Sequence, residues 1–207
     1  ADVPAYEYRD AGRVGDALVA EVVRGAAEHL VPGGVFQSLG NWEYRDDEDG
    51  LERVRAWVAE SSVPVDAWVV EREQLSPLAY AELWVRDGGT VPGTPEYARL
   101  IEAWLADFAA RGVRAVGFGY VLLHRPPSCR VTLSRYERVE TAASVDGAAL
   151  AASLAAHARS VELDDAALAA RRLIVAPDVT EARHHRPGEE APTVIELRQG
   201  GGVGRAL

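Results

Sequence analysis

The stretch EHLVPGGVFQSLGNWEY, residues 28–44, predicts a helix end, a tight turn and a strand in immediate succession. A helix is expected to end at Leu30, because the following Pro-Gly-Gly cannot continue it and glycine accepts the backbone angles of a reversal. The uncharged run 35–39 then predicts a short strand. Such a run is typical of a strand buried on both faces, as in a parallel sheet covered by helices.

Small, polar and aromatic residues follow this strand, in the order Gly40-Asn41-Trp42-Glu43-Tyr44. Ligands of open α/β sheets bind beside the carboxyl ends of the strands. Residues 40–44 are therefore a candidate ligand-contacting tip.

The residues before this stretch predict a loop and then an amphipathic helix. Residues 16–30 place apolar side chains on one face at helical spacing, with Asp16 near the positive helix start. Residues 1–13 have no periodicity but carry Tyr6, Tyr8, Arg9 and Asp10. This segment is either a surface loop that packs two tyrosines or part of a binding site.

The residues after the tip alternate between helix and strand patterns, which indicates an α/β fold. The acidic run 46–49 is a solvated loop or a metal site, and negative charge ahead of a helix favours the loop. The short connection containing Pro126-Pro127 favours an antiparallel hairpin between the last two strands. The expected helices cover residues 49–61, 77–86 and 95–111, and the expected strands cover residues 66–71, 115–123 and 130–139.

The pattern changes after Thr141, where an alanine-rich region begins. Helices are expected at 145–159 and 164–171, and strands at 172–181 and 192–199, with His184 and His185 at the turn between the strands. Adjacent histidines of a strand point to opposite sides, so no metal site is expected there. We therefore expect two domains, residues 1–140 and 141–207, the second a small winged-helix-like α+β appendage.

The composition limits the possible functions of the chain. A net charge of −10 over 207 residues argues against general electrostatic binding to nucleic acid. No run of eighteen apolar residues and no signal peptide is present, so no membrane association is expected. The single cysteine, Cys129, suits a reducing cytoplasm.

Four motifs together resemble one enzyme family. They are the tyrosine- and arginine-containing segment 6–10, Gly15-Asp16-Ala17-Leu18, Leu30-Val31-Pro32-Gly33-Gly34 and Asn41-Trp42. Their order is similar to the C-terminal part of class I methyltransferases that use S-adenosylmethionine (SAM) and belong to the N-P-P-[FY] group. Relatives of this kind include an actinobacterial family and the release-factor glutamine, rRNA and DNA amino-group methyltransferases.

The resemblance implies the second half of a Rossmann-like methyltransferase sheet, with parallel strands and an antiparallel hairpin. The glycine-rich loop and the acidic strand end that bind SAM in the family are absent, and N-P-P-[FY] is expected just before Ala1. The implied cofactor is SAM, and the implied acceptor is an amino or amide nitrogen of nucleic acid or protein. By resemblance, Tyr6, Tyr8, Arg9, Asp10, Asn41 and Trp42 would bind this acceptor. The alternative is a Rossmann-like binding or assembly module without catalysis.

Overall fold

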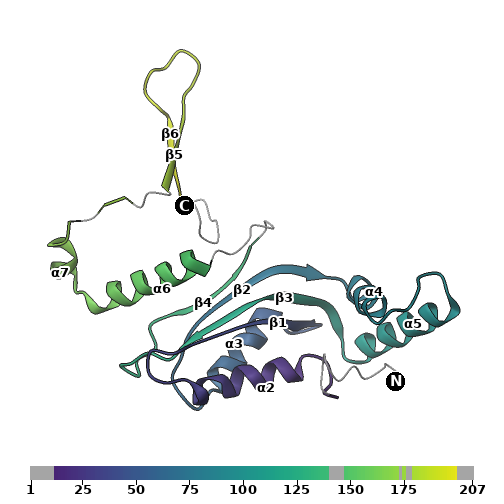
Figure 1. Cartoon of the computed structure of the whole chain (residues 1–207). Helices are drawn as coiled ribbons and strands as arrows, with labels where there is room; N and C mark the ends of the chain where they lie inside the picture. The colour runs from purple at the N-terminus through teal and green to yellow at the C-terminus, as the bar shows by residue number, and fades with distance from the viewer. Residues whose placement is uncertain (1–11, 140–146, 173, 176–178, 200–207) are drawn as a thin grey trace. The chain divides into compact units, whose positions relative to one another are not determined.

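The computed structural model describes residues 12–139, 147–172, 174–175 and 179–199, which belong to two compact units, Ala1–Glu140 and Thr141–Leu207 (Figure 1). The first unit is a mixed α/β fold around a four-stranded sheet. Its elements are α2 (Ala17–Ala26), the 3-10 helix η1 (Ala27–His29), β1 (Val35–Arg45), α3 (Gly50–Ala59), β2 (Asp66–Leu75), α4 (Pro77–Asp87), α5 (Pro95–Ala110), β3 (Val113–His124) and β4 (Ser134–Arg138).

Three helices of this unit begin where the sequence provides a capping side chain. Asp49, Ser76 and Thr94 each accept a hydrogen bond from a backbone N–H of the first helical turn of α3, α4 and α5, respectively. Such bonds satisfy donors that have no partner within the helix. The helix starts expected from the sequence are therefore confirmed.

The strand order is β1-β3-β2-β4, with β3 antiparallel to both β1 and β2 and with β2 parallel to β4. The expected hairpin between the last two strands is wrong, because β4 pairs with β2 instead of β3. The buried carboxylate of Asp66 at the start of β2 accepts hydrogen bonds from the backbone N–H groups of Thr132 (2.6 Å) and Leu133 (2.8 Å). These bonds hold the segment before β4 beside β2.

The prediction of a short, fully buried strand at residues 35–39 is also wrong. β1 continues to Arg45, pairs with β3 alone in the described residues, and therefore lies at an edge of the sheet. Val35 is 43% exposed and Leu39 is 57% exposed. An uncharged run fixes strand structure but does not show whether helices cover both faces of that strand.

The sheet has two different faces. On the helix face, side chains such as Trp42, Val69 and Leu123 pack against α2 and α3, which lie side by side (Figure 1). The second face carries the alternate residues, among them Leu39 of β1 and Tyr120 of β3, which are opposite each other. A separate apolar cluster joins α4 and α5 to one end of β3, and its members include Val85, Leu100, Trp104, Phe108, Val113 and Val116.

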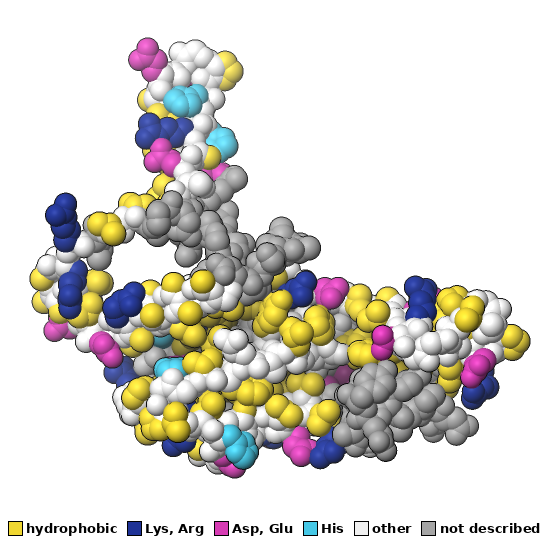
Figure 2. Space-filling model, in the orientation of Figure 1, with side chains coloured by type: hydrophobic (Ala, Val, Ile, Leu, Met, Phe, Trp, Pro, Cys, Tyr) yellow, Lys and Arg dark blue, Asp and Glu magenta, His cyan; other side chains and the backbone are white. Residues whose placement is uncertain are grey.

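The second unit contains α6 (Gly147–Glu162), α7 (Asp165–Ala169) and an antiparallel hairpin of β5 (Val179–His184) and β6 (Val194–Gln199). The expected strand at 172–181 starts later than predicted, at Val179. None of the residues of this unit whose burial is described (147–148, 150–172, 174–175 and 179–197) is buried, and its hairpin carries acidic, basic and histidine side chains together (Figure 2). This unit therefore has no apolar core within its described residues.

Across the described residues, no helix has the length and apolar character needed to cross a lipid bilayer.

Two leucines of the sheet provide a test of the two faces. Leu123 is 0% exposed and Leu39 is 57% exposed. Leu123→Ala should lower the free energy of unfolding by about 2–5 kcal/mol, because it leaves a cavity in the core. Leu39→Ala should change it by less than about 0.5 kcal/mol. Urea unfolding measures both values, and equal losses would contradict the assignment of the faces.

Candidate functional site

The carboxyl ends of β1, β2 and β4 lie together with the start of β3, at the end of the sheet where these strands terminate. Tyr44 of β1 is opposite Ala115, and Leu75 of β2 is opposite Val116. The first residues of α2 and α3 reach the same edge, through contacts of Asp16 and Asp49 described below. We call this region the carboxyl edge, and it contains most of the buried polar groups of the unit.

The carboxylate of Glu71 is the centre of the carboxyl edge. Glu71 is 3% exposed and accepts hydrogen bonds from Trp42 Nε1 (2.6 Å) and from the Tyr44 hydroxyl (2.7 Å). Arg138 of β4 donates to the same carboxylate through Nε (3.3 Å) and pairs with Asp49 through Nη2 (2.6 Å). The group therefore connects β1, β2 and β4 with the first turn of α3.

Two glycines of β3 make room for this connection. A Cβ atom at Gly117 would overlap the Glu71 carboxylate and the indole nitrogen of Trp42. A Cβ atom at Gly119 would overlap the backbone of β2. Glycine is thus needed at both positions for close approach of neighbouring groups.

The Tyr44 hydroxyl remains protonated at this position. Burial, and then the hydrogen bond to Glu71, raises the pKa of Tyr44 above its ordinary value. A neutral phenol donates to the carboxylate, whereas a phenolate beside it would add a second negative charge in a place of low solvation. The hydroxyl of Tyr44 therefore stays protonated and donates its hydrogen bond to Glu71 throughout the physiological pH range.

A second group of charges connects β1 to the helices. Asp16 accepts a hydrogen bond from the backbone N–H of Glu43 (3.0 Å) and forms an ion pair with Arg53 of α3 (2.9 Å). Glu43 is 3% exposed and forms ion pairs with Arg45 (2.9 Å) and with Arg111. Asp16, which the sequence places at a helix start, therefore ties α2 to β1 and α3.

Each buried carboxylate of the carboxyl edge is thus held by hydrogen bonds or arginine. No group of three or more His, Cys, Asp or Glu side chains in the described residues could hold a metal ion. The acidic run 46–49 follows this pattern, since Asp49 caps α3 and Glu48 pairs with Arg53. The arrangement orders this part of the sheet, and the buried carboxylates of Asp16, Glu43 and Glu71 are all engaged in these contacts.

The structure separates the two site residues expected on β1. Asn41 is partly buried, and its Nδ2 donates to the hydroxyl of Tyr80 of α4 (2.6 Å). Trp42 is 0% exposed, so its ring has no free face on which a ligand could stack. The expected stacking role of Trp42 is therefore corrected: this side chain is a core residue that donates to Glu71. The other expected site residues, Tyr6, Tyr8, Arg9 and Asp10, lie outside the described residues.

Sequence reasoning missed Glu71 and Tyr80. Glu71 follows the apolar run 67–70, and a charge directly after such a run was a usable signal for a buried partner. Tyr80 gave no comparable signal, because its partner Asn41 lies 39 residues earlier in the chain. Its ring packs in edge contact with Trp104 and Phe108, each at a centroid distance of 6.0 Å.

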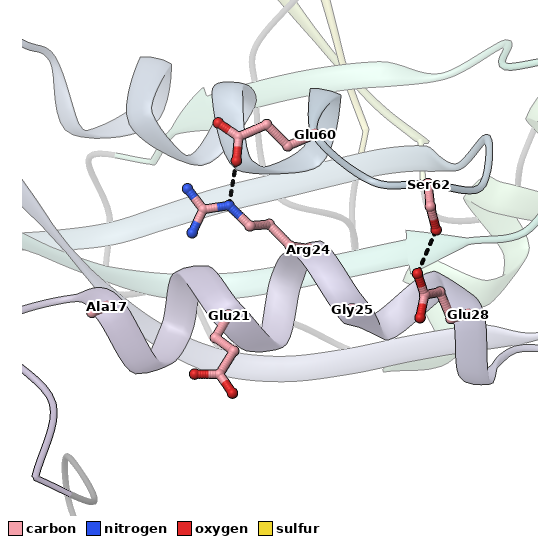
Figure 3. Close-up of a pocket in the computed structure, with 7 residues that line it drawn as sticks. All are labelled: Ala17, Glu21, Arg24, Gly25, Glu28, Glu60 and Ser62. Carbon is pink, nitrogen blue, oxygen red and sulfur yellow. Dashed lines mark hydrogen bonds and ion pairs between the residues drawn. The ribbon is translucent and has the colours of Figure 1, made fainter.

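Two hollows lie away from the carboxyl edge. The first is a groove between α2 and the end of α3, where Arg24 pairs with Glu60 and Ser62 donates to Glu28 (Figure 3). Glu21, which also borders it, pairs with Arg13 outside the groove. Each charged side chain of this surface groove therefore already has a hydrogen-bond or ion-pair partner.

The second hollow lies between the loop after α3 and the start of β4. Its lining is mostly apolar, with Val58, Val65 and Leu133 among the contributing residues. Tyr136 borders it beneath the guanidinium of Arg55, whose Cζ lies 4.1 Å from the ring centroid. Burial raises the pKa of Tyr136 to about 12.

Comparison with family models, curated proteins and solved structures finds no match to this chain. The site is therefore interpreted from its own geometry and from the motifs of the sequence.

Removal of the Glu71 carboxylate should destabilise the first unit. Glu71→Ala leaves buried donors of Trp42 and Tyr44 without their acceptor, which should cost on the order of 3 kcal/mol of unfolding free energy. Glu73→Ala, an exposed position on the same strand, is the matched control and should stay within about 0.5 kcal/mol of the parent. Equal effects of the two substitutions in denaturant unfolding would contradict the central role of Glu71.

The raised pKa of Tyr136 predicts a stability change in alkali. In the unfolded chain this phenol ionises near pH 10, while in the folded protein it stays neutral to about pH 12. Its stabilising contribution is therefore complete below pH 10 and is lost as the pH rises from 10 to 12. Tyr136→Phe should weaken this loss, measured as the slope of unfolding free energy against pH.

Proposed function

We propose that the first unit is the second half of the Rossmann-like catalytic domain of a SAM-dependent N-methyltransferase. The observation that carries the proposal is that α2 directly precedes β1, a strand whose outer edge is unpaired in the described residues. Helix α2 begins at the carboxyl edge, where Asp16 holds Glu43, and its last turn leads through residues 30–34 into the start of β1. A helix that runs back along the sheet in this way supports the interpretation of α2 as the crossover of a β-α-β unit.

A crossover helix needs a preceding strand parallel to β1. The outer edge of β1 has no strand partner in the described residues, so a strand there would extend the sheet. The motifs Gly15-Asp16-Ala17-Leu18 and Leu30-Val31-Pro32-Gly33-Gly34 lie at the two ends of this crossover. Their positions support the resemblance, and the proposal assigns the N-P-P-[FY] element to the strand beside β1.

The described residues do not by themselves provide a SAM site. No glycine-rich turn connects a strand to a helix start among them, and the acids Glu43 and Glu71 near the strand ends are buried and paired. We therefore assign cofactor binding to the part of the protein that pairs with β1, and no step of the reaction is assigned to the described residues.

The proposed role of this chain is to hold the methyl acceptor. Transfer to an amino or amide nitrogen requires mainly orientation of that nitrogen and exclusion of water. In this proposal Tyr6, Tyr8, Arg9 and Asp10 border the acceptor, and Asn41 supports the same region through Tyr80. The acceptor is a nitrogen of nucleic acid or protein, and the lone Cys129 suits action in the cytoplasm.

We further propose that the second unit is a winged-helix-like appendage of this domain. Helices α6 and α7 and the β5–β6 hairpin provide two helices and a wing. Since none of its described side chains is buried, a partner surface would provide the apolar contacts that this unit lacks.

A second candidate function is a binding or assembly module without catalysis. The matched ion pairs of Asp16, Glu43 and Arg111 favour it, because they give the carboxyl edge a structural role. Calorimetric titration with SAM separates the two functions. Under the first proposal, residues 1–207 alone bind SAM weakly or not at all, and a version extended upstream binds it. Micromolar binding by residues 1–207 alone would contradict the assignment of the cofactor site, and no binding by the extended version would favour the second function.

In the extended protein, Arg9→Ala should lower turnover of the acceptor by roughly tenfold to a hundredfold, the value of one charge-assisted hydrogen bond. The affinity for SAM should stay unchanged. Arg13→Ala, whose side chain pairs with exposed Glu21, is the matched control and should keep the parental rate. Parental turnover in both folded variants would remove Arg9 from the acceptor site.

A further inference from the structure

Arg72 lies at a β-bulge on the second face of the sheet. The pairing of β2 with β3 shifts between Glu71 and Glu73, so Arg72 is the extra residue of β2. Bulges re-aim side chains, and here the guanidinium lies over the ring of Tyr120, with Cζ 5.5 Å from the centroid. Its Nη1 also donates to the Tyr120 hydroxyl (3.3 Å).

Arg72 has no acidic partner among the described residues. Its contacts there are with the ring and hydroxyl of Tyr120, both neutral. The other partly buried arginines near the carboxyl edge differ from it, because Arg45, Arg53 and Arg111 each form ion pairs with carboxylates. A partly buried guanidinium without a counter-ion keeps free donors that suit a carboxylate or a phosphate.

Several neighbours of Arg72 on the second face are apolar or aromatic, and exposed Glu73 is opposite one of them, Phe118. Leu39, which is 57% exposed, is opposite Tyr120, and the partly buried Phe118 lies next to it on β3. Phe118 is also opposite Asn41, the residue that binds Tyr80. The guanidinium of Arg72 thus lies beside an apolar patch that is formed by Leu39, Phe118 and Tyr120.

The charges nearby limit the kind of anion. Glu73, one residue from Arg72, is exposed and acidic, and the chain as a whole carries a charge of −10. Both repel an extended polyanion more strongly than a single anionic group. The ligand that matches these side chains is therefore a small one with one anionic group and an apolar or aromatic body.

We propose that Arg72, Tyr120, Phe118 and Leu39 form a binding site for a single oxyanion, carboxylate or phosphate monoester, attached to an apolar or aromatic body. Arg72 binds the oxyanion through its free N–H groups, while the ring of Tyr120 holds the guanidinium in place from below. Phe118 and Leu39 contact the body of the ligand. This binding site is inferred independently of the proposed function.

The test uses the chain of residues 1–207 and two small probes, benzoate and phenyl phosphate, with neutral benzamide as the control ligand. Amide chemical shifts in two-dimensional NMR report the binding. We expect saturable shifts at Glu71, Arg72, Glu73 and Tyr120 with at least one anionic probe, and no saturable shift with benzamide. The stronger of the two anions identifies the source as a carboxylate or a phosphate.

Variants assign the binding to the guanidinium. Arg72→Gln should weaken the binding of the anion at least tenfold, and Arg72→Lys, which keeps the charge but not the planar fork, should weaken it less. Arg99→Gln, an exposed arginine of α5, should leave it unchanged. Unfolding midpoints of all three variants should equal that of the parent, which shows that the fold is kept.

Three results would overturn the proposal: no saturable shift with either anion, equal binding of benzamide, or full binding by folded Arg72→Gln. Failure of the proposed function gives a different result. If the extended protein does not bind SAM while the anion still binds at Arg72, methyl transfer is excluded and the anion site remains.

Discussion

The structure of the first unit depends on the buried carboxylate of Glu71. Three strands contribute to its environment, since Trp42 and Tyr44 of β1 and Arg138 of β4 donate to this group on β2. The strand between them, β3, carries glycine where the groups meet. A buried carboxylate costs free energy unless its acceptor positions are filled. The positions of the strands thus depend on this one set of hydrogen bonds.

The ion pairs of the carboxyl edge and the unpaired Arg72 have different consequences. Asp16 pairs with Arg53 and Glu43 pairs with Arg111, so this region is ordered and has little capacity for further ionic contacts. Arg72 reaches the second face through a bulge, where its side chain contacts the ring and hydroxyl of Tyr120. Glu71 and Arg72 are neighbours on β2 but point to opposite faces of the sheet. The first therefore has a structural role, whereas the second is available to bind a ligand.

The two units are stabilised to different degrees by their own side chains. The first unit has two apolar clusters, one beneath α2 and α3 and one between α4, α5 and β3. The second unit has no buried side chain among the residues whose burial is described, in keeping with a long alanine-rich helix. Alanine promotes helix formation but offers little surface for packing. Helical propensity and pairing of one hairpin therefore form elements there without forming a core.

The sequence by itself determined the helices, their caps and most strand positions, because side-chain period, capping residues and Pro-Gly turns act within a few residues. It also indicated that Asp16 starts a helix and that residues 35–39 form a strand. Only the tertiary structure decided that β1 lies at an edge, that β4 pairs with β2, and that Trp42 is buried against Glu71. The physical reason is that strand pairing and buried polar contacts join residues far apart in the chain. Which strands pair and which polar groups meet depends on the faces and acceptors that the folded neighbours leave available. The local sequence does not contain this information.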